Sequence, residues 1–103
     1  MRYEQIMETH GRPLSDIGVS EMALDRQFAL VAVDALRTEG RPILGGDVYR
    51  VVGGKPVPSY DNWFCEKQAV EGIEAFVQRS CDVAERFVRT YPTAEQSLFT
   101  LVI

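Results

Sequence analysis

The spacing of apolar and polar residues predicts three helices separated by extended segments. A short first helix is indicated by residues three or four positions apart, namely Tyr3, Ile6, Met7 and His10. A second helix follows Asp25, whose carboxylate is suited to cap it, and Gly40 and Pro42 end that helix. The longest helix has an unbroken apolar face made by Ile73, Phe76, Val77, Ser80, Cys81, Ala84, Phe87 and Val88.

The remaining apolar segments predict strands. Residues 17–24 indicate a loop that passes into a short strand, and residues 43–52 with 55–57 have the composition of a tight hairpin. Pro56 and Pro58 cannot donate to a ladder, so the second hairpin strand is expected either to lie at a sheet edge or to be short and irregular. Residues 97–103 are apolar on both faces, as in a strand with two neighbours. These elements predict one α+β domain over residues 1–103, with a mostly antiparallel sheet of about four strands and helices packed on one face.

The hairpin region from Ile43 to Phe64 contains two glycine pairs and the only tryptophan. Neither glycine pair fits a phosphate-binding loop or a dinucleotide fingerprint, so we interpret all four as structural, namely Gly45, Gly46, Gly53 and Gly54. We expect Asp61 and Asn62 to form a turn that directs Trp63 into the core. In this interpretation Val48 and Tyr49 point to opposite faces of the sheet, and the face that carries the tyrosine is covered by a helix or a partner.

Composition and charge narrow the class of partner. The chain has 103 residues, 46% hydrophobic and 25% charged, which is typical of one folded globular domain. Its net charge of −4 and the lack of a basic stripe argue against nucleic-acid binding and are compatible with a basic protein partner. The start of the chain does not resemble a signal peptide and no apolar run is long enough to span a membrane, so a cytoplasmic protein is expected. Cys65 and Cys81 are interpreted as reduced, partly buried thiols.

A catalytic centre is not indicated by the reactive residues. His10 is the only histidine, and we interpret it as a helix-end residue rather than a base or a metal ligand. No metal site or cofactor is therefore expected. Asp47 and Asp61 flank the hairpin and could face one another, which leaves a small enzyme or a ligand-binding domain with a site around them as the alternative. A self-associating structural subunit is a third hypothesis.

Two stretches of the hairpin region resemble a known family. The run PILGGDVY, followed after a glycine turn by YDNWFCE, is similar to the bacterial Immunity protein 40 family of polymorphic toxin systems over roughly residues 14 to 90. The resemblance implies a non-enzymatic antidote that binds a cognate toxin and blocks its active or substrate-binding surface. The acidic net charge of the chain is compatible with a basic toxin. We expect a monomer or weak homodimer whose partner-binding residues are Asp47, Tyr49, Tyr60, Asp61, Asn62 and Glu66.

Overall fold

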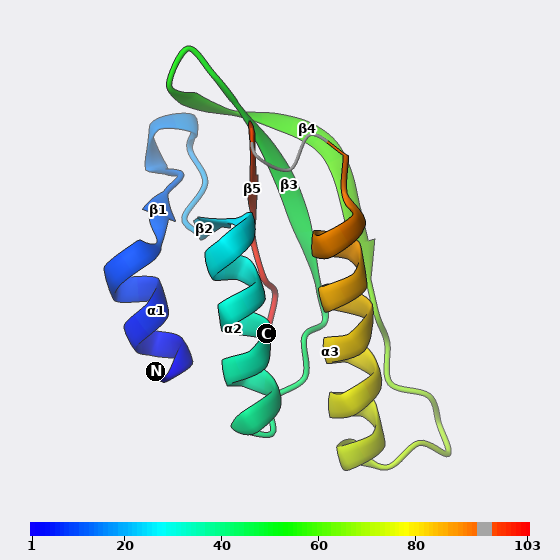
Figure 1. The fold of residues 1–103 in the computed structure, drawn as a ribbon. Helices are drawn as coiled ribbons and strands as arrows, with labels where there is room; N and C mark the ends of the chain where they lie inside the picture. The colour runs from blue at the N-terminus through cyan, green and yellow to red at the C-terminus, as the bar shows by residue number, and fades with distance from the viewer. Residues whose placement is uncertain (93–95) are drawn as a thin grey trace.

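The computed structural model describes residues 1–92 and 96–103, in which three α-helices cover one face of a five-stranded antiparallel sheet (Figure 1). Their order is α1 (Tyr3–His10), β1 (Arg12–Pro13), the 3-10 helix η1 (Ser15–Ile17), β2 (Met22–Asp25), α2 (Arg26–Thr38), β3 (Gly45–Val52), β4 (Lys55–Phe64), α3 (Ile73–Thr90) and β5 (Ser97–Phe99). The predicted α+β class with helices on one face is confirmed. About four strands were expected, and the further one is β1.

The helix boundaries follow from local signals in the sequence. At the start of α2 the backbone N–H of Phe28 donates to Asp25 Oδ1 at 2.9 Å, as predicted for a capping residue. The chain leaves α2 at Gly40, which has a φ of +71° that an L-residue adopts with strain. At the end of α1 the His10 ring stacks on Phe28, with ring centroids 3.5 Å apart. His10 therefore packs at a helix end.

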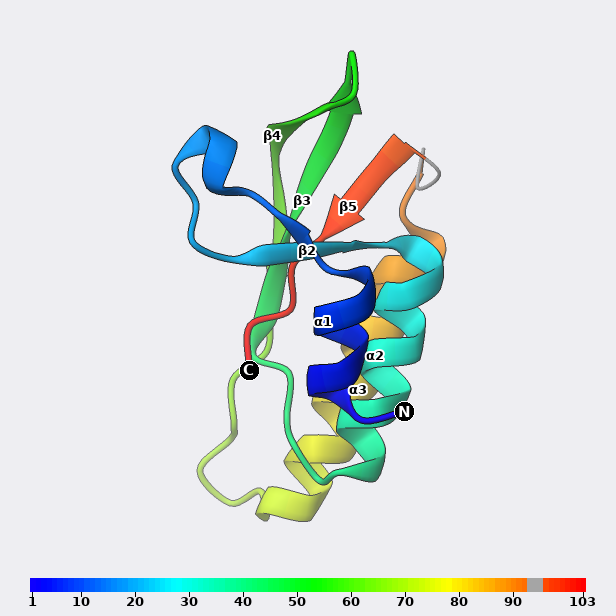
Figure 2. The ribbon, with the colours of Figure 1, turned by 90° about the vertical axis from the view of Figure 1, so that its left-hand side faces the viewer.

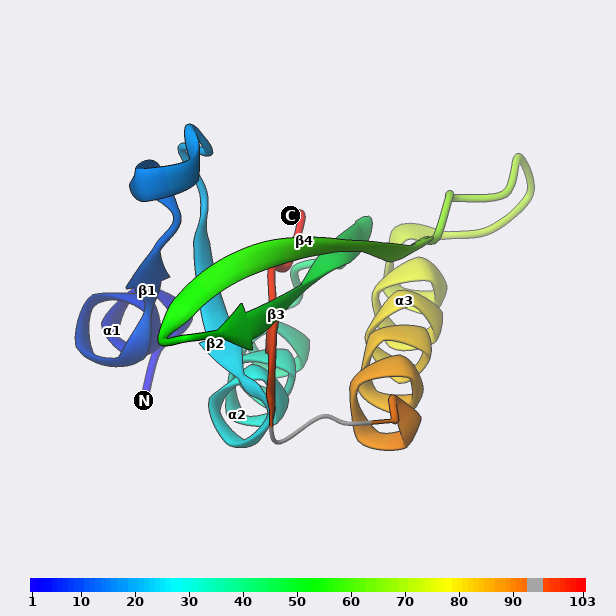
Figure 3. The same cartoon turned by 90° about the horizontal axis from the view of Figure 1, so that it is seen from above.

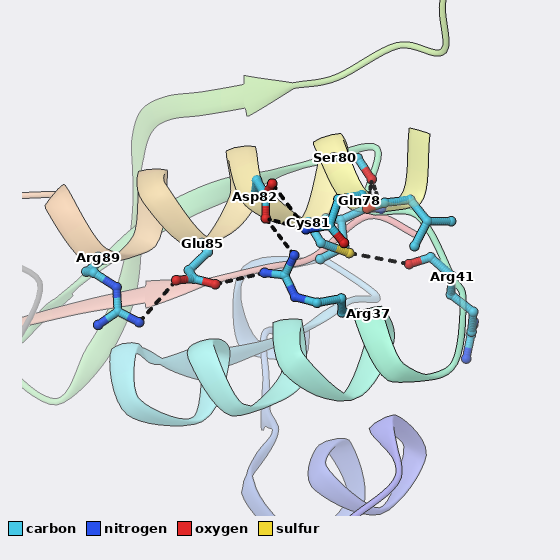
Figure 4. Close-up of polar contacts among 10 residues, drawn as sticks. Arg37, Arg41, Gln78, Ser80, Cys81, Asp82, Glu85 and Arg89 are labelled. Atoms are coloured by element: carbon cyan, nitrogen blue, oxygen red, sulfur yellow. Dashed lines mark hydrogen bonds and ion pairs between the residues drawn. The ribbon is translucent and has the colours of Figure 1, made fainter. Parts of the chain in front are cut away.

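Polar contacts fix α3 against α2 (Figure 4). Arg37 of α2 reaches two carboxylates of α3, Asp82 at 2.6 Å and Glu85 at 2.8 Å. Nearer the start of α3, Ser80 Oγ accepts a hydrogen bond from the Ile43 backbone N–H at 3.1 Å in a buried position. These contacts tie α3 both to α2 and to the chain that enters β3, so α3 is held beneath the hairpin.

The strand order is β1-β2-β5-β3-β4, and neighbouring strands are antiparallel. β4 lies at one edge of the sheet, as predicted from the prolines. β5 is central, with β2 and β3 as neighbours, which confirms the prediction from residues 97–103 for Ser97–Phe99, and beyond this strand Val102 forms an isolated bridge with Gly45. Gly53 and Gly54 have φ values of +57° and +79°, the conformation of a two-residue type I′ hairpin turn. The hairpin spans from the side of β1 to that of α3 (Figure 3), and its tip extends beyond the helices.

The two faces of the sheet are covered differently (Figure 2). On the helix side the main core includes Val48, Trp63 and Phe99. On the other side a smaller cluster of Leu14, Ala23, Tyr49 and Leu98 is buried beneath the chain around η1. The opposite orientations predicted for Val48 and Tyr49 are confirmed, and the cover over Tyr49 is the 14–21 segment rather than a long helix.

Both cysteines are free and buried, in agreement with the predicted reduced thiols. Cys81 Sγ lies 3.7 Å from the Arg41 carbonyl oxygen. Burial raises the pKa of the Cys81 thiol above its ordinary value, which favours the protonated form. Among the helices described, none is both long and apolar enough to cross a membrane.

Candidate partner-binding site

The centre of β4 carries a bulge at Tyr60. Asp47 pairs with Asn62 and Tyr49 pairs with Pro58, so the single residue Val48 stands opposite residues 59–61. Tyr60 has a φ of +68°, and within residues 1–92 and 96–103 it is the one non-glycine residue with a positive φ. Its side chain is 88% exposed. A bulky side chain is therefore held in solvent by an unfavourable backbone conformation.

Three hydrogen bonds hold the bulge in this shape. Ser59 Oγ donates to the Val48 carbonyl at 2.7 Å and accepts from the Asp61 backbone N–H at 3.2 Å. The Tyr91 hydroxyl, just beyond α3, donates to Asp61 Oδ2 at 2.6 Å. That bond raises the pKa of Tyr91, because the neutral phenol is the donor. Hydrogen bonds to β3 and to Tyr91 at the end of α3 thus fix the bulge that contains the exposed Tyr60.

Trp63 follows the bulge and points toward the helices. It is 8% exposed, and its ring stacks on Phe87 of α3 with centroids 4.5 Å apart. The ring lies over Gly46, where an added Cβ would stand 2.3 Å from the indole and 2.1 Å from the Thr100 carbonyl oxygen. The predicted core position of Trp63 is confirmed. The predicted turn at Asp61 and Asn62 is wrong, because both lie in β4 and the Tyr60 bulge redirects the chain instead.

On the opposite side of β4 an apolar surface is open to solvent. Phe64 is 75% exposed and pairs with Gly45, which in turn bridges to Val102, 39% exposed. Paired residues point to the same face of a sheet, so Phe64 and Val102 flank a position without a side chain. Phe64 was missed as a candidate contact. Successive side chains in a strand point to opposite faces, so the predicted inward orientation of Trp63 already indicates that Phe64 points to solvent.

Five of the six predicted contact residues line one hollow of about 260 Å³, namely Asp47, Tyr49, Tyr60, Asp61 and Asn62. Tyr60 offers most of its ring to solvent, whereas Tyr49 is only 8% exposed. Burial raises the pKa of Tyr49, and the charges of Asp47 and Glu21 add to the effect. Because Asp47 and Asp61 line the hollow, its rim is acidic. The role of these residues as partner contacts stays a prediction.

Glu66 lies outside the hollow, in the connection between β4 and α3. Arg79 organises that connection by donating to Glu71 at 2.7 Å, to the Glu66 carbonyl at 2.6 Å and to Cys65 Sγ at 3.2 Å. The hydrogen bond from Arg79 lowers the pKa of Glu71 to about 2. No group of histidine, cysteine and acidic residues suited to a metal ion occurs in the described part of the chain. An ion pair, rather than an apolar core, shapes this segment.

The comparisons with known proteins give one match. The family model described as Immunity protein 40 matches residues 13–103, which extends beyond the 14–90 region of resemblance to include β5 and the carboxyl end. No curated protein and no solved structure matches the chain. The matched region contains the whole sheet from Pro13 onward, together with the bulge and the hollow.

Proposed function

The chain belongs to the Immunity protein 40 family, and from that premise we propose that it is an antidote that binds a protein toxin and blocks the toxin's active or substrate-binding surface. It performs no catalysis itself in this proposal and acts in the cytoplasm of the cell that it protects. The single observation that carries the proposal is Tyr60, an exposed aromatic residue fixed in the left-handed conformation.

The backbone conformation of Tyr60 is unfavourable for the isolated domain. The left-handed conformation costs an L-residue about 1–2 kcal/mol, and a ring that is 88% exposed regains little of this by burial. Glycine would adopt the same backbone more readily. Tyrosine is enriched among the residues that dominate binding at protein interfaces. We therefore assign the Tyr60 side chain to contact with another molecule, and the supported bulge to its orientation.

The charges around Tyr60 favour a basic partner surface. Asp47 and Asp61 line the hollow beside Tyr60, and the exposed Glu66 lies two residues beyond Phe64, in the connection that follows β4. The net charge of the chain is −4. Complementary charges accelerate encounter and disfavour wrong partners more than they add affinity. In this proposal the acidic rim attracts the toxin, and the aromatic side chains hold it.

Co-expression tests the proposal. The chain is produced in bacteria together with the product of the toxin-like gene that neighbours its own, and growth and complex formation on gel filtration are measured. We expect growth to be restored and the two proteins to co-elute. Intact growth inhibition, together with separate elution of two folded proteins, would reject the proposal for that toxin.

A further inference from the structure

The free edge of β4 differs before and after the bulge. In the first part, Val52 and Lys55 flank a two-residue turn and therefore form a hydrogen-bonded pair. Alternation along the strand then directs the nitrogen atoms of Pro56 and Pro58 to the free edge, where neither can donate. This half of the edge is closed to a further strand, a known way of preventing unwanted sheet extension.

The second part of the edge is open. Thr100 N–H donates to the Asp47 carbonyl and Val102 N–H donates to the Gly45 carbonyl, so the backbone groups of Asp47 and Gly45 point toward the carboxyl-terminal segment. Their partners in β4, Asn62 and Phe64, then direct their own N–H and C=O groups away from β3. Within residues 1–92 and 96–103, no other element bonds to these groups.

The side chains along this edge indicate the chemistry of an occupant. Phe64 and Tyr60 are 75% and 88% exposed, and they are flanked by the exposed acids Asp61 and Glu66. A segment with apolar and basic side chains complements this row. A second copy of the chain fits it less well, because self-pairing would place another set of Asp61 and Glu66 carboxylates beside the first.

We infer that an extended, basic segment of the toxin pairs with Asn62–Phe64 as an additional strand of the sheet. This inference rests on the proposed function and specifies its geometry. The backbone groups of Asn62 and Phe64 form the main-chain bonds, Phe64 and Tyr60 contact apolar side chains, and the Tyr60 bulge ends the paired stretch on one side.

Amide hydrogen exchange measured by NMR tests the pairing without altering the chain. The probe is the complex of the intact chain with a catalytically inactive form of the neighbouring gene's toxin. In the free protein we expect the Asn62 and Phe64 amides to exchange readily and the Trp63 amide, which faces β3, to be protected. In the complex, exchange at Asn62 and Phe64 should slow by about tenfold or more.

A pair of substitutions at one position separates backbone from side-chain contributions. Phe64→Pro removes the outward N–H together with the ring, whereas Phe64→Ala removes only the ring. The proline variant should bind the toxin about tenfold more weakly than the alanine variant, as the loss of a hydrogen bond with a desolvated partner predicts. Thermal melts verify that both variants are folded. If the proline variant is unfolded, the hydrogen-exchange measurement on the intact chain tests the strand pairing instead.

The outcomes separate the two proposals. A complex in which the Asn62 and Phe64 amides exchange as fast as in the free protein overturns the strand pairing and leaves the antidote function intact. The absence of any complex overturns both. Protection that rises with the concentration of this chain alone, without toxin, identifies a second copy as the occupant and also overturns the inference.

Discussion

Tyr60 and Trp63 lie close together in β4 and have opposite surroundings. Trp63 is 8% exposed and stacks on Phe87 of α3, whereas Tyr60 is 88% exposed and stands on a bulge. Burial of the indole stabilises the domain, while the backbone conformation of Tyr60 weakens it. The comparison shows that two aromatic residues three positions apart in one strand have different roles, one inside the fold and one outside it.

The glycines sharpen this contrast. At Gly46 the close approach of Thr100 and the Trp63 ring leaves no room for a Cβ, and the chain has glycine there. At Tyr60 the backbone conformation favours glycine, and the chain has a large aromatic residue instead. Stability explains the first choice but not the second. An exposed residue that costs stability is a reason to look for a binding role.

The largest expected effect is that of Trp63→Ala. Loss of a large aromatic residue from the core should lower the free energy of unfolding by about 3–5 kcal/mol. Trp63→Phe is the matched control and should cost much less, because Trp63 Nε1 has no hydrogen-bond partner among the described residues to lose. Chemical denaturation measures both variants. A Trp63→Ala variant of normal stability that fails to bind would make Trp63 an interface residue and contradict its assignment to the core.

Gly46→Ala should have the next largest effect. The new methyl group would stand 2.1 Å from the Thr100 carbonyl and 2.3 Å from the indole, so the strands must separate or the ring must move. We expect a loss of about 1–3 kcal/mol, typical of overpacking. Gly72→Ala provides a control at a site with open space around it and a negative φ of −71°, where neither crowding nor backbone strain opposes the substitution. Equal losses at both sites would argue against the close packing of Trp63 on Gly46.

These effects also show what the sequence could reveal. Apolar periodicity predicts α3 and the inward Trp63, because both are set by burial along one element. The bulge was missed because residues 59–61 contain no glycine to indicate a positive φ, and Asp61-Asn62 is a dipeptide common in turns. β1 was missed because its two residues, Arg12 and Pro13, form a strand only by pairing with Ala23 and Met22. The bulge and β1 both depend on contacts between segments that are distant in the sequence, and local residue patterns do not reveal such contacts.

A smaller and pH-dependent effect is expected in the connection after β4. Arg79 holds the pKa of Glu71 at about 2, below the ordinary value of 4.5. A lowered carboxyl pKa stabilises the fold above the unfolded-state value, and that contribution is lost as the pH falls from about 4.5 to about 2. Glu71→Gln should therefore lower the melting temperature at pH 7, and the difference from the parent chain should vanish near pH 2. A difference that is independent of pH would contradict the ion pair.

The smallest effect on stability is expected for Asp47→Lys. Asp47 is bound to Thr100 through its backbone, with its N–H donating to Thr100 Oγ1 at 2.9 Å, so reversing the side-chain charge should change the free energy of unfolding by less than about 0.5 kcal/mol. Association with a basic toxin should nevertheless become slower, most clearly at low salt. Asp34→Lys makes the same change of net charge on α2, beside a separate hollow. Stopped-flow rates that fall equally for both variants would indicate a net-charge effect without a local site.

The most direct test of the division between Trp63 and Tyr60 is to measure stability and toxin binding of one variant, Tyr60→Gly. Relief of the left-handed strain, set against the greater freedom of glycine in the unfolded chain, should leave the free energy of unfolding unchanged or raise it by up to about 1 kcal/mol. Binding of the toxin should weaken by about thirtyfold or more, as for an interface residue that dominates affinity. A Tyr60→Gly variant that binds as tightly as the parent chain would contradict the assignment of Tyr60 to the binding surface.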